Sequence, residues 1–424
     1  MTILETAREL LATGPLCTAC LGRPFADRSF GLRNDERGKA LRVTANLEDD
    51  EPYEPDDDCW VCEGLCEEFD AYADRVVDAL EGIEFRTYQL GTRVPPLLEE
   101  NESLLREDAG LEEDAGEPLK SEFNREVGRR VGVRLEKEVD FQRPDVQVLL
   151  DLDEDTVEVQ INSVAVYGRY RKLERDIPQT KWPCSNCHGS GHLTNRPCPE
   201  CDGTGFRYPT SVQQEVAPTL VTALRGREGV FHGAGREDVD ALMLGEGRPF
   251  VLEVKEPHRR FVDLETLEEE INEQSDGKIE VEGLRFATYD MVERVKEHDA
   301  SKRYRAQVEF GASVTDEELQ SALEKLQGAT IEQRTPHRVD HRRADLVRTR
   351  EVYDIEGELE DDTHATVDVH GAGGLYIKEL ISSDEGRTTP SLAGLLGVEA
   401  VVTHLDVLSV EGEAEAFEDP EFFY

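Results

Sequence analysis

Eight of the nine cysteines in this 424-residue chain form four C-x-x-C pairs, and this pattern restricts the possible fold more than any other feature. Two residues between thiols let one tight turn aim both sulfurs at the same ion, and two such turns complete a tetrahedral site of four thiolates. No apolar run is long enough for a transmembrane helix, and the first residues lack the apolar stretch of a secretory signal. We therefore expect a cytoplasmic protein whose cysteines bind metal and do not form disulfides.

The four pairs predict two structural zinc sites, which would contribute to folding and not to catalysis. The first would be formed by Cys17, Cys20, Cys59 and Cys62, with the ninth cysteine, Cys66, as a bystander. In residues 184–205 the motif C-x-x-C-x-G-x-G occurs twice, and its ligands would be Cys184, Cys187, Cys198 and Cys201. The glycines let the backbone turn beneath each pair with its N–H groups facing sulfur. We expect the nearby His188 and His192 to be solvent-exposed, because four thiolates already complete a site. The alternative is that the pairs are unrelated surface cysteines.

The net charge indicates the medium in which the chain folds. There are 93 acidic and 48 basic side chains, a balance of −45, and only 11 of the basic residues are Lys. Such a surface repels polyanions at low salt and appears at first to exclude nucleic-acid binding. In molar salt the Debye length falls to about 3 Å, so that this charge no longer acts at a distance. We interpret the composition as an adaptation to a salt-rich cytosol, with an ordinary acidic protein as the alternative.

Two segments are cationic despite this background. Residues 334–350 contain six Arg and two Asp, a net charge of +4, and residues 169–181 contain five cations and two acids, a net charge of +3. Arg suits phosphate because its planar guanidinium binds two oxygens at once. We expect RNA phosphate contacts from Arg169, Arg171, Lys172, Arg342 and Arg343. The alternative is that both segments are ordinary solvated faces.

Hydrophobic periodicity predicts an α+β protein with four parts: residues 1–66, 67–183, 184–205 and 206–424. In the second part we expect a helix in FDAYADRVVDALEG and one continuous strand, TVEVQINSVAVYG, over residues 156–168. In the last part strand patterns outnumber helices, which favours a mixed or antiparallel sheet flanked by helices. One of these helices should begin at Thr315, because Thr315 and Glu318 form the T-x-x-E pattern of a capping box.

Four motifs occur in one order: VYGRYRKLERDIPQTKWPC, GREDVDALMLGEGRPFVLEV, TPHRVDHRRADLVR and GLYIKELISSDEGRTTPSLAGLL. Together they resemble the archaeal–eukaryotic tRNA pseudouridine(54/55) synthase family over most of the chain. The resemblance is weakest in the acidic residues 47–58 and 99–117. It implies a THUMP-related, zinc-binding N-terminal domain that binds tRNA, followed by a pseudouridine synthase domain. The family has one zinc, so the resemblance supports the first cysteine site more strongly than the second.

The resemblance also assigns roles to individual residues. Asp238, which follows Gly235 and Arg236, would be the nucleophile. Tyr304 would lie against the target uracil and assist proton loss, and Lys378 would be the charge partner of Asp238. The remaining residues of the substrate pocket would be Arg236, Tyr376 and Leu405, with Ile377 packed beneath. The substrate would be the T-loop of tRNA, modified at uridine 54, uridine 55 or both.

The chemistry read from the residues alone agrees with this assignment. Converting uridine to pseudouridine breaks N1–C1′ and forms C5–C1′ without oxidation, so that no cofactor is needed. A carboxylate can form a covalent intermediate, and the chain lacks a phosphate-binding loop, a serine-hydrolase elbow and an H-E-x-x-H motif. Two alternatives remain at this point. One is another THUMP-bearing RNA modifier, such as a methyltransferase, and the other is a zinc-dependent RNA-binding or chaperone-like protein without catalysis.

Overall fold

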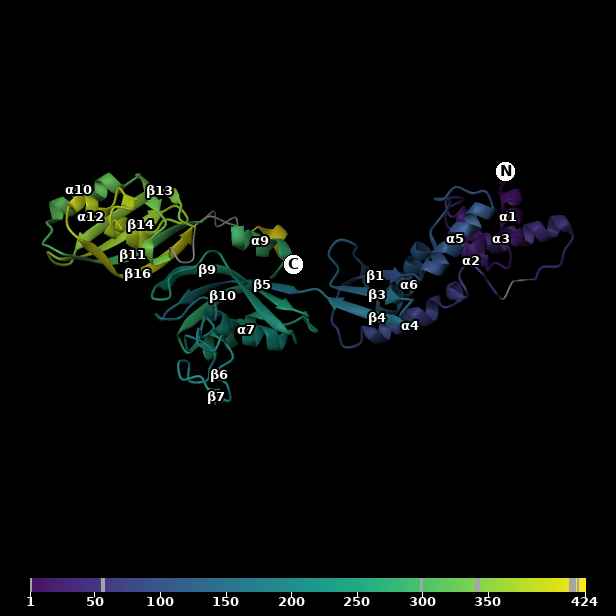
Figure 1. Ribbon diagram of the computed structural model, residues 1–424, viewed down its shortest axis with the longest axis horizontal. Helices are drawn as coiled ribbons and strands as arrows, with labels where there is room; N and C mark the ends of the chain where they lie inside the picture. Colours follow the sequence, from purple (N-terminus) through teal and green to yellow (C-terminus); the bar gives the residue numbers. More distant parts are fainter. Residues whose placement is uncertain (1, 55–57, 298–299, 340–343, 412–416, 418) are drawn as a thin grey trace. The chain divides into compact units, whose positions relative to one another are not determined.

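The computed structural model describes residues 2–54, 58–297, 300–339, 344–411, 417 and 419–424, and the chain divides into two compact units. Unit 1 is Met1–Asn162 and unit 2 is Ser163–Tyr424 (Figure 1). Within the described residues, no helix combines the length and apolar character needed to cross a membrane.

Unit 1 consists of helices packed around a small sheet. Its main helices are α1 (Ile3–Ala12), α2 (Thr18–Gly22), α3 (Asn34–Asp49), α4 (Phe69–Ala79), α5 (Pro96–Asp108) and α6 (Leu119–Leu135). Its strands are β1 (Thr87–Arg93), β2 (Glu138–Val139), β3 (Val146–Asp151) and β4 (Thr156–Ile161), in the order β2-β1-β3-β4. The pairs of β1 with β2 and β3 are parallel, whereas β3 and β4 form an antiparallel hairpin.

The expected boundary at residue 66 does not separate two cores. One hydrophobic cluster runs from Ala7 through the four buried cysteines of the first two pairs to Phe123 and Leu150. The cysteine turns and the sheet therefore share one interior, because each segment alone is too short to bury its apolar face.

The expected strand over residues 156–168 is wrong, and with it the boundary at residue 183. The chain ends β4 at Ile161 and begins β5 (Val164–Lys172) in a different sheet, so that the change of unit falls at Asn162 and Ser163. Asn162 ends the first sheet, because its backbone N–H donates to Asp145 and its side chain donates to Pro144. Alternation of apolar residues continues through the junction and therefore gives no sign of it.

Unit 2 is built on one long mixed sheet, as expected from the sequence. Its strands are β5, β8 (Glu228–Gly233), β9 (Leu242–Lys255), β10 (Ile279–Ala287), β11 (Ser301–Phe310), β12 (Thr330–Arg334), β13 (Val347–Leu359), β14 (His364–Gly371), β15 (Thr388–Thr389) and β16 (Ala400–Glu411). They follow the order β10-β5-β9-β16-β11-β14-β13-β12-β15, and β8 pairs with β9. The contact of β9 with β16 is parallel and short, whereas the other pairs are antiparallel.

Helices cover this sheet in two groups. They are α7 (Val212–Ala223), α8 (Leu264–Gln274), α9 (Tyr289–Glu297), α10 (Asp316–Leu326), α11 (Ile377–Ser382) and α12 (Leu392–Leu396). The predicted capping box is confirmed, since Thr315 and Glu318 exchange side chain–backbone hydrogen bonds of 2.9 and 3.3 Å at the start of α10. Two hydrophobic clusters fill the two halves of the sheet, and Tyr304 on β11 packs against both. The seam between these halves lies beneath the pocket of Asp238.

Candidate active site and metal centres

Asp238 lies in the loop between β8 and β9, at a polar pocket of about 480 Å³. The pocket is lined by Trp182, Arg236, Glu237, Asp238, Val239, Asp240, Arg338, Val339 and Lys378. These residues come from four separate stretches of unit 2, so only the folded chain brings them together. The Asp238 side chain is 38% exposed, which leaves its carboxylate accessible from the pocket.

Two cations hold the Asp238 carboxylate. Arg338 Nη1 lies 3.1 Å from Oδ2, and Lys378 Nζ lies 3.4 Å from the same oxygen. Lys378 also pairs with Asp240 at 3.0 Å, so it is shared between two carboxylates. The structure thus places the expected Lys378 beside Asp238 and adds Arg338, which sequence reasoning missed. Its location within the cationic residues 334–350 was the available signal.

Arg338 is itself fixed by α11. Its Nε donates to the buried Glu379 at 2.7 Å, and its guanidinium lies 6.0 Å from the ring centre of Tyr376. Burial opposes the charge of Arg338, but the hydrogen bond and charge of Glu379 outweigh burial and raise its pKa. Burial likewise acts to raise the pKa of Asp240, but Lys378 outweighs it and the pKa is lowered. These interactions therefore favour the charged forms of Arg338 and Asp240.

The residue before Asp238 has a different role. Glu237 is buried and accepts hydrogen bonds from Tyr170 Oη at 2.8 Å and Arg248 Nε at 2.9 Å. Tyr170 lies on β5 and Arg248 on β9, so these two strands of unit 2 fix the loop. Glu237 anchors the loop, whereas Asp238 faces the pocket.

Lys172 was expected to contact RNA, and this expectation is wrong. Its side chain is fully buried, and Nζ donates to the carbonyls of Ile177, Asp238 and Val239 at 2.8–3.2 Å. Burial lowers the pKa of this Lys, although the charge of Glu237 opposes the effect. A sequence count of cations cannot distinguish a buried Lys that holds a loop from an exposed one.

The other expected RNA contacts differ in position. Arg169 is partly exposed and donates to the carbonyl of Gly247, while Arg171 pairs with Glu280 at 3.0 Å. Arg342 and Arg343 lie outside the residues that the structure describes. Their contact with phosphate stays a prediction.

Tyr304 lies beneath the site at the seam of the sheet. Burial raises its pKa to about 12, with the charges of Asp238 and Glu237 adding to the rise and Arg248 opposing it. Leu405 is buried in the adjacent cluster on β16, paired with Ala306, and does not line the pocket of Asp238. Tyr376 caps α11, and its backbone exchanges two hydrogen bonds of 2.9 Å with Gln333. Arg236 is exposed at the pocket.

The first metal centre differs from the expected set by one cysteine. Among the described residues, the sulfurs of Cys17, Cys20, Cys62 and Cys66 all lie within 4.8 Å of one another. Cys59 is outside this group, although its thiol also interacts with Cys17 and Cys20. Cys66, interpreted from the sequence as a bystander, thus occupies the place expected for Cys59. Cys66 lies in the short 3₁₀ helix Leu65–Glu67, which begins directly after the turn at Cys62.

The donor set fits zinc. Zinc bonded to four sulfurs at about 2.3 Å separates them by about 3.8 Å in tetrahedral geometry, and the sulfurs of Cys17 and Cys62 lie 3.7 Å apart. Arg23 is buried beside them, with Nη2 3.4 Å from the Cys20 sulfur and Nε 3.1 Å from Glu102. A buried guanidinium offsets the negative charge of the thiolates and orients them through hydrogen bonds.

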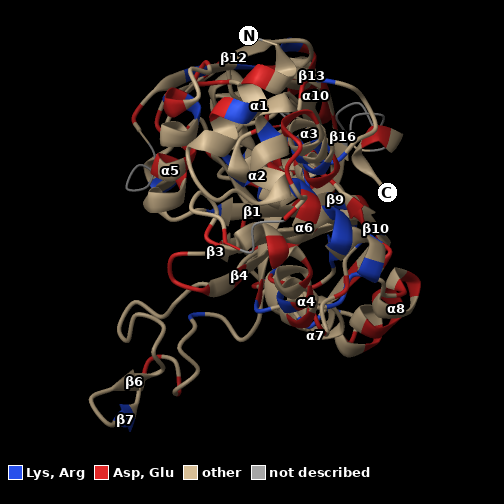
Figure 2. Cartoon of the chain, turned by 90° about the vertical axis from the view of Figure 1, so that its right-hand side faces the viewer, with Lys and Arg blue, Asp and Glu red and all other residues tan. Residues whose placement is uncertain are grey.

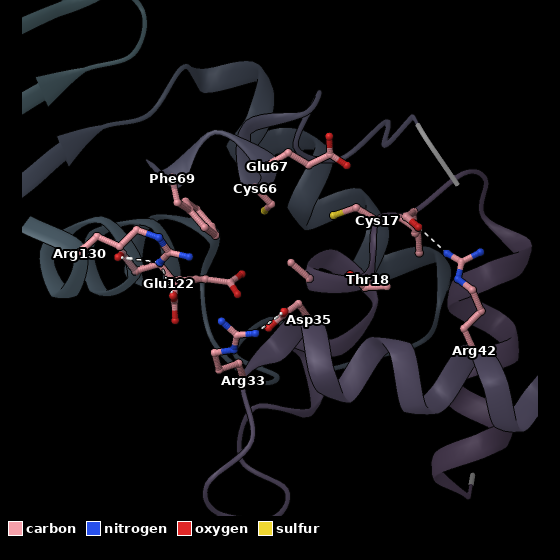
Figure 3. A pocket seen from close by; sticks show the side chains of 13 residues that line it. Cys17, Thr18, Arg33, Asp35, Arg42, Cys66, Glu67, Phe69, Glu122 and Arg130 are labelled. Carbon is pink, nitrogen blue, oxygen red and sulfur yellow. Dashed lines mark hydrogen bonds and ion pairs between the residues drawn. The ribbon is translucent and has the colours of Figure 1, made fainter. Parts of the chain in front are cut away.

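A pocket of about 320 Å³ adjoins this centre (Figure 3). The side chains of Cys17 and Cys66 lie at its edge, and Arg33, Glu122 and Arg130 surround it. Cations and acids are mixed in its lining, and the pocket brings solvent close to the first cysteine cluster.

The second cysteine cluster brings together the four cysteines predicted to bind the second zinc. Cys184, Cys187, Cys198 and Cys201 are all buried and form one group within 4.8 Å. The sulfurs of Cys184 and Cys198 are 3.9 Å apart, which also suits four-thiolate zinc. The backbone N–H groups of Gly191 and Gly205 each lie 3.3 Å from a sulfur, and His188 and His192 are exposed, as predicted.

At the seam of the mixed sheet, two cations hold the Asp238 carboxylate near the partly buried Tyr304. Residues 165–411 match the family described as "Pus10, C-terminal", and residues 72–151 match "Pus10 THUMP domain, archaeal". The chain belongs to the Pus10 family of tRNA pseudouridine synthases.

Curated relatives cover the whole chain. The "tRNA pseudouridine synthase Pus10" of Halorubrum lacusprofundi is 63% identical over 100% of both chains. The protein of the same name from Methanothrix thermoacetophila is 44% identical over 98% of this chain and 96% of its own. A solved "Cbf5-Nop10-Gar1 Complex" aligns with 46% of this chain and 45% of its own, at 19% identity and a TM-score of 0.29, which is too distant to add to the argument.

Proposed function

We propose that this enzyme isomerises uridine 54, uridine 55 or both in the T-loop of tRNA, with Asp238 as nucleophile and without a cofactor. The observation that supports the proposal is the accessible Asp238 carboxylate, held between Arg338 and Lys378 at 3.1 and 3.4 Å. The two cations hold and orient the carboxylate, and a carboxylate can act as a nucleophile. The relatives' shared name, "tRNA pseudouridine synthase Pus10", supports tRNA as the substrate.

Each residue at the site has a part in the exchange. Asp238 forms a covalent bond to the nucleotide, which divides the cleavage of N1–C1′ and the formation of C5–C1′ into easier steps. The target uridine must leave its stack to reach Asp238 in the pocket. Tyr304, beneath the site, supports the uracil through its ring and its hydroxyl, whose pKa burial raises to about 12. Both cysteine centres hold structural zinc, which supplies folding free energy.

The decisive test is Asp238→Asn, which keeps the size of the side chain and removes the nucleophile. We expect tRNA binding to persist and pseudouridine formation to fall to background, because no other group can form the covalent bond. The assay is pseudouridine formed in an unmodified tRNA transcript at molar salt with nothing added. Transcripts with cytidine at position 54 or at position 55 identify the uridine that is modified.

Asp240→Asn is the matched control. Asp240 shares Lys378 with Asp238 but lies farther along the loop. The Asp240→Asn enzyme should therefore retain substantial activity. Glu237→Gln, an obvious second control, is unsuitable because it breaks a buried ion pair with Arg248. Robust turnover by Asp238→Asn would overturn the assignment, as would equal and complete loss in Asp240→Asn.

A further inference from the structure

The Cys-rich insert is attached to the active site by a short stem. Its two ends pair through Arg207 N–H to the Trp182 carbonyl at 2.9 Å and Cys184 N–H to the Gly205 carbonyl at 2.8 Å. An isolated bridge joins Pro183 to Phe206 between them. The second cysteine cluster therefore begins two residues after Trp182, and the paired stem limits the movement of the Trp182 backbone.

Trp182 reaches the catalytic pocket and carries a cation on its ring. It lines the pocket of Asp238, and the Arg236 guanidinium carbon lies 4.9 Å from the centre of its ring. Tyr208, from the other side of the stem, contacts Trp182 edge-on with ring centres 5.5 Å apart. Trp182 is partly exposed and Arg236 is exposed, so that this pair forms part of the pocket surface.

We propose that Trp182 and Arg236 form a stacking surface for an unpaired base of the tRNA substrate, next to the target uridine. This inference rests on the proposed function. RNA-binding proteins hold unstacked bases on aromatic rings and on Arg guanidinium planes, and a guanidinium fixed over an indole presents such a plane. A metal bound at the second cysteine centre would then contribute to substrate binding, because it would hold the stem that carries Trp182.

The geometry favours a base over a phosphate as the occupant. Arg236 lies over the Trp182 ring in cation–π contact, and Arg207 also lies over this ring, 5.8 Å from its centre. Three further aromatic or planar groups, Tyr208, Arg207 and Phe206, belong to the same stem. Such a cluster of planar groups suits stacking, which is tolerant of base identity.

The first experiment compares Trp182→Leu with Trp182→Phe. Loss of one base–aromatic stack weakens RNA binding about 10- to 100-fold. We expect Trp182→Leu to raise KM or Kd for a T-arm stem-loop RNA by this factor, and Trp182→Phe to restore most of it. Zinc content of both variants should equal that of the wild type. Wild-type affinity in Trp182→Leu would overturn the inference, as would a loss that occurs only together with loss of zinc.

A second experiment identifies the stacked base. T-arm RNAs with an abasic nucleotide at each loop position are bound to the wild type and to Trp182→Leu. If Trp182 holds one base, removal of that base weakens wild-type binding and has no further effect on the variant. Equal sensitivity of both proteins at every position would refute the inference. If the wild type forms no pseudouridine in intact tRNA, the proposed function fails, which is a separate outcome.

Fluorescence gives an independent readout. The chain has two Trp residues, and Trp60 lies in unit 1. In a Trp60→Phe protein, emission comes from Trp182 alone. T-arm RNA should quench this emission with the same Kd as the binding assay, and unchanged emission at saturating RNA would contradict a stacked base.

Discussion

At the residue scale, the site depends on two adjacent acids with opposite environments. Glu237 is buried against Tyr170 and Arg248, whereas Asp238 is accessible beside Arg338 and Lys378. The buried acid fixes the backbone and the accessible one is free to react. Such a division of work between neighbouring carboxylates follows from environment and not from residue type.

Arg338 provides the sharpest test of how Asp238 is held. Removing a charge-assisted hydrogen bond costs about 1.5–3 kcal/mol, so Arg338→Gln should lower kcat about 10- to 100-fold. Arg334→Gln is the matched control, because Arg334 belongs to the same segment but pairs with the exposed Asp345. Single-turnover kinetics on a tRNA transcript measure both. Equal rates for the two variants would show that Arg338 does not support Asp238 in the reaction.

The raised pKa of Tyr304 predicts that the free energy of unfolding depends on pH. Its pKa is about 10 in an unfolded chain and about 12 in the fold. The native state thus retains the proton more strongly than the unfolded chain. The contribution of Tyr304 to the free energy of unfolding is therefore complete below pH 10 and is lost as pH rises through 12. The full effect is about 3 kcal/mol, of which about 1 kcal/mol is lost between pH 9 and 11.

Tyr304→Phe removes this contribution, so its free energy of unfolding should fall less steeply over that range than that of the wild type. Denaturant unfolding at molar salt measures the two slopes. Tyr353→Phe, at a tyrosine that is 44% exposed, is the control. Identical slopes for wild type and Tyr304→Phe would contradict the buried, protonated phenol.

At the element scale, the turns between α2 and α4 decide which sulfurs form the first four-cysteine group. Five thiols meet in this part of unit 1, but only four can complete a tetrahedral site. The fifth thiol is left as a neighbour of the site.

The competing ligands, Cys59 and Cys66, can be separated by substitution. If the described geometry is the metal-bound one, Cys66→Ser lowers zinc from about two equivalents to about one, whereas Cys59→Ser retains both. Metal analysis of the purified proteins measures this, with Cys184→Ser as the control that affects only the second centre. Loss of zinc in Cys59→Ser alone would show that Cys59 is a ligand and Cys66 is not, as expected from the sequence.

At the scale of the whole molecule, the charge of −45 acts on every element. Acidic positions occur on helices and loops throughout the cartoon of Figure 2. Many acids have no cation available, since they outnumber cations by 93 to 48. Salt screens this repulsion, so we predict that the stability of the fold rises with ionic strength.

We expect the melting temperature to fall steadily as KCl is lowered from molar to 0.1 M, because the Debye length grows from about 3 to about 10 Å. The fall should amount to several degrees or more, and NaCl should act equally at the same ionic strength. Thermal unfolding followed by circular dichroism measures it. A melting temperature independent of ionic strength would contradict a fold limited by self-repulsion.

Local spacing was sufficient to predict much of this protein. Residue pairs a few positions apart determine the C-x-x-C turns of the second metal centre and the capping box at Thr315, because their geometry is set by the intervening backbone. Local patterns also identified the mixed sheet of unit 2, and the order of four motifs identified the family.

Other features were decided only by tertiary structure. Arg338 lies 100 residues from Asp238, and no local pattern pairs them. Lys172 and Arg171 are adjacent cations in the sequence, yet the first is buried beneath the catalytic loop and the second is on the surface. Tertiary structure also decides whether Cys59 or Cys66 joins the first cysteine group, and it places the junction between the units at Asn162. Burial and long-range pairing depend on how distant segments close around one another, which the spacing of residues along the chain does not specify.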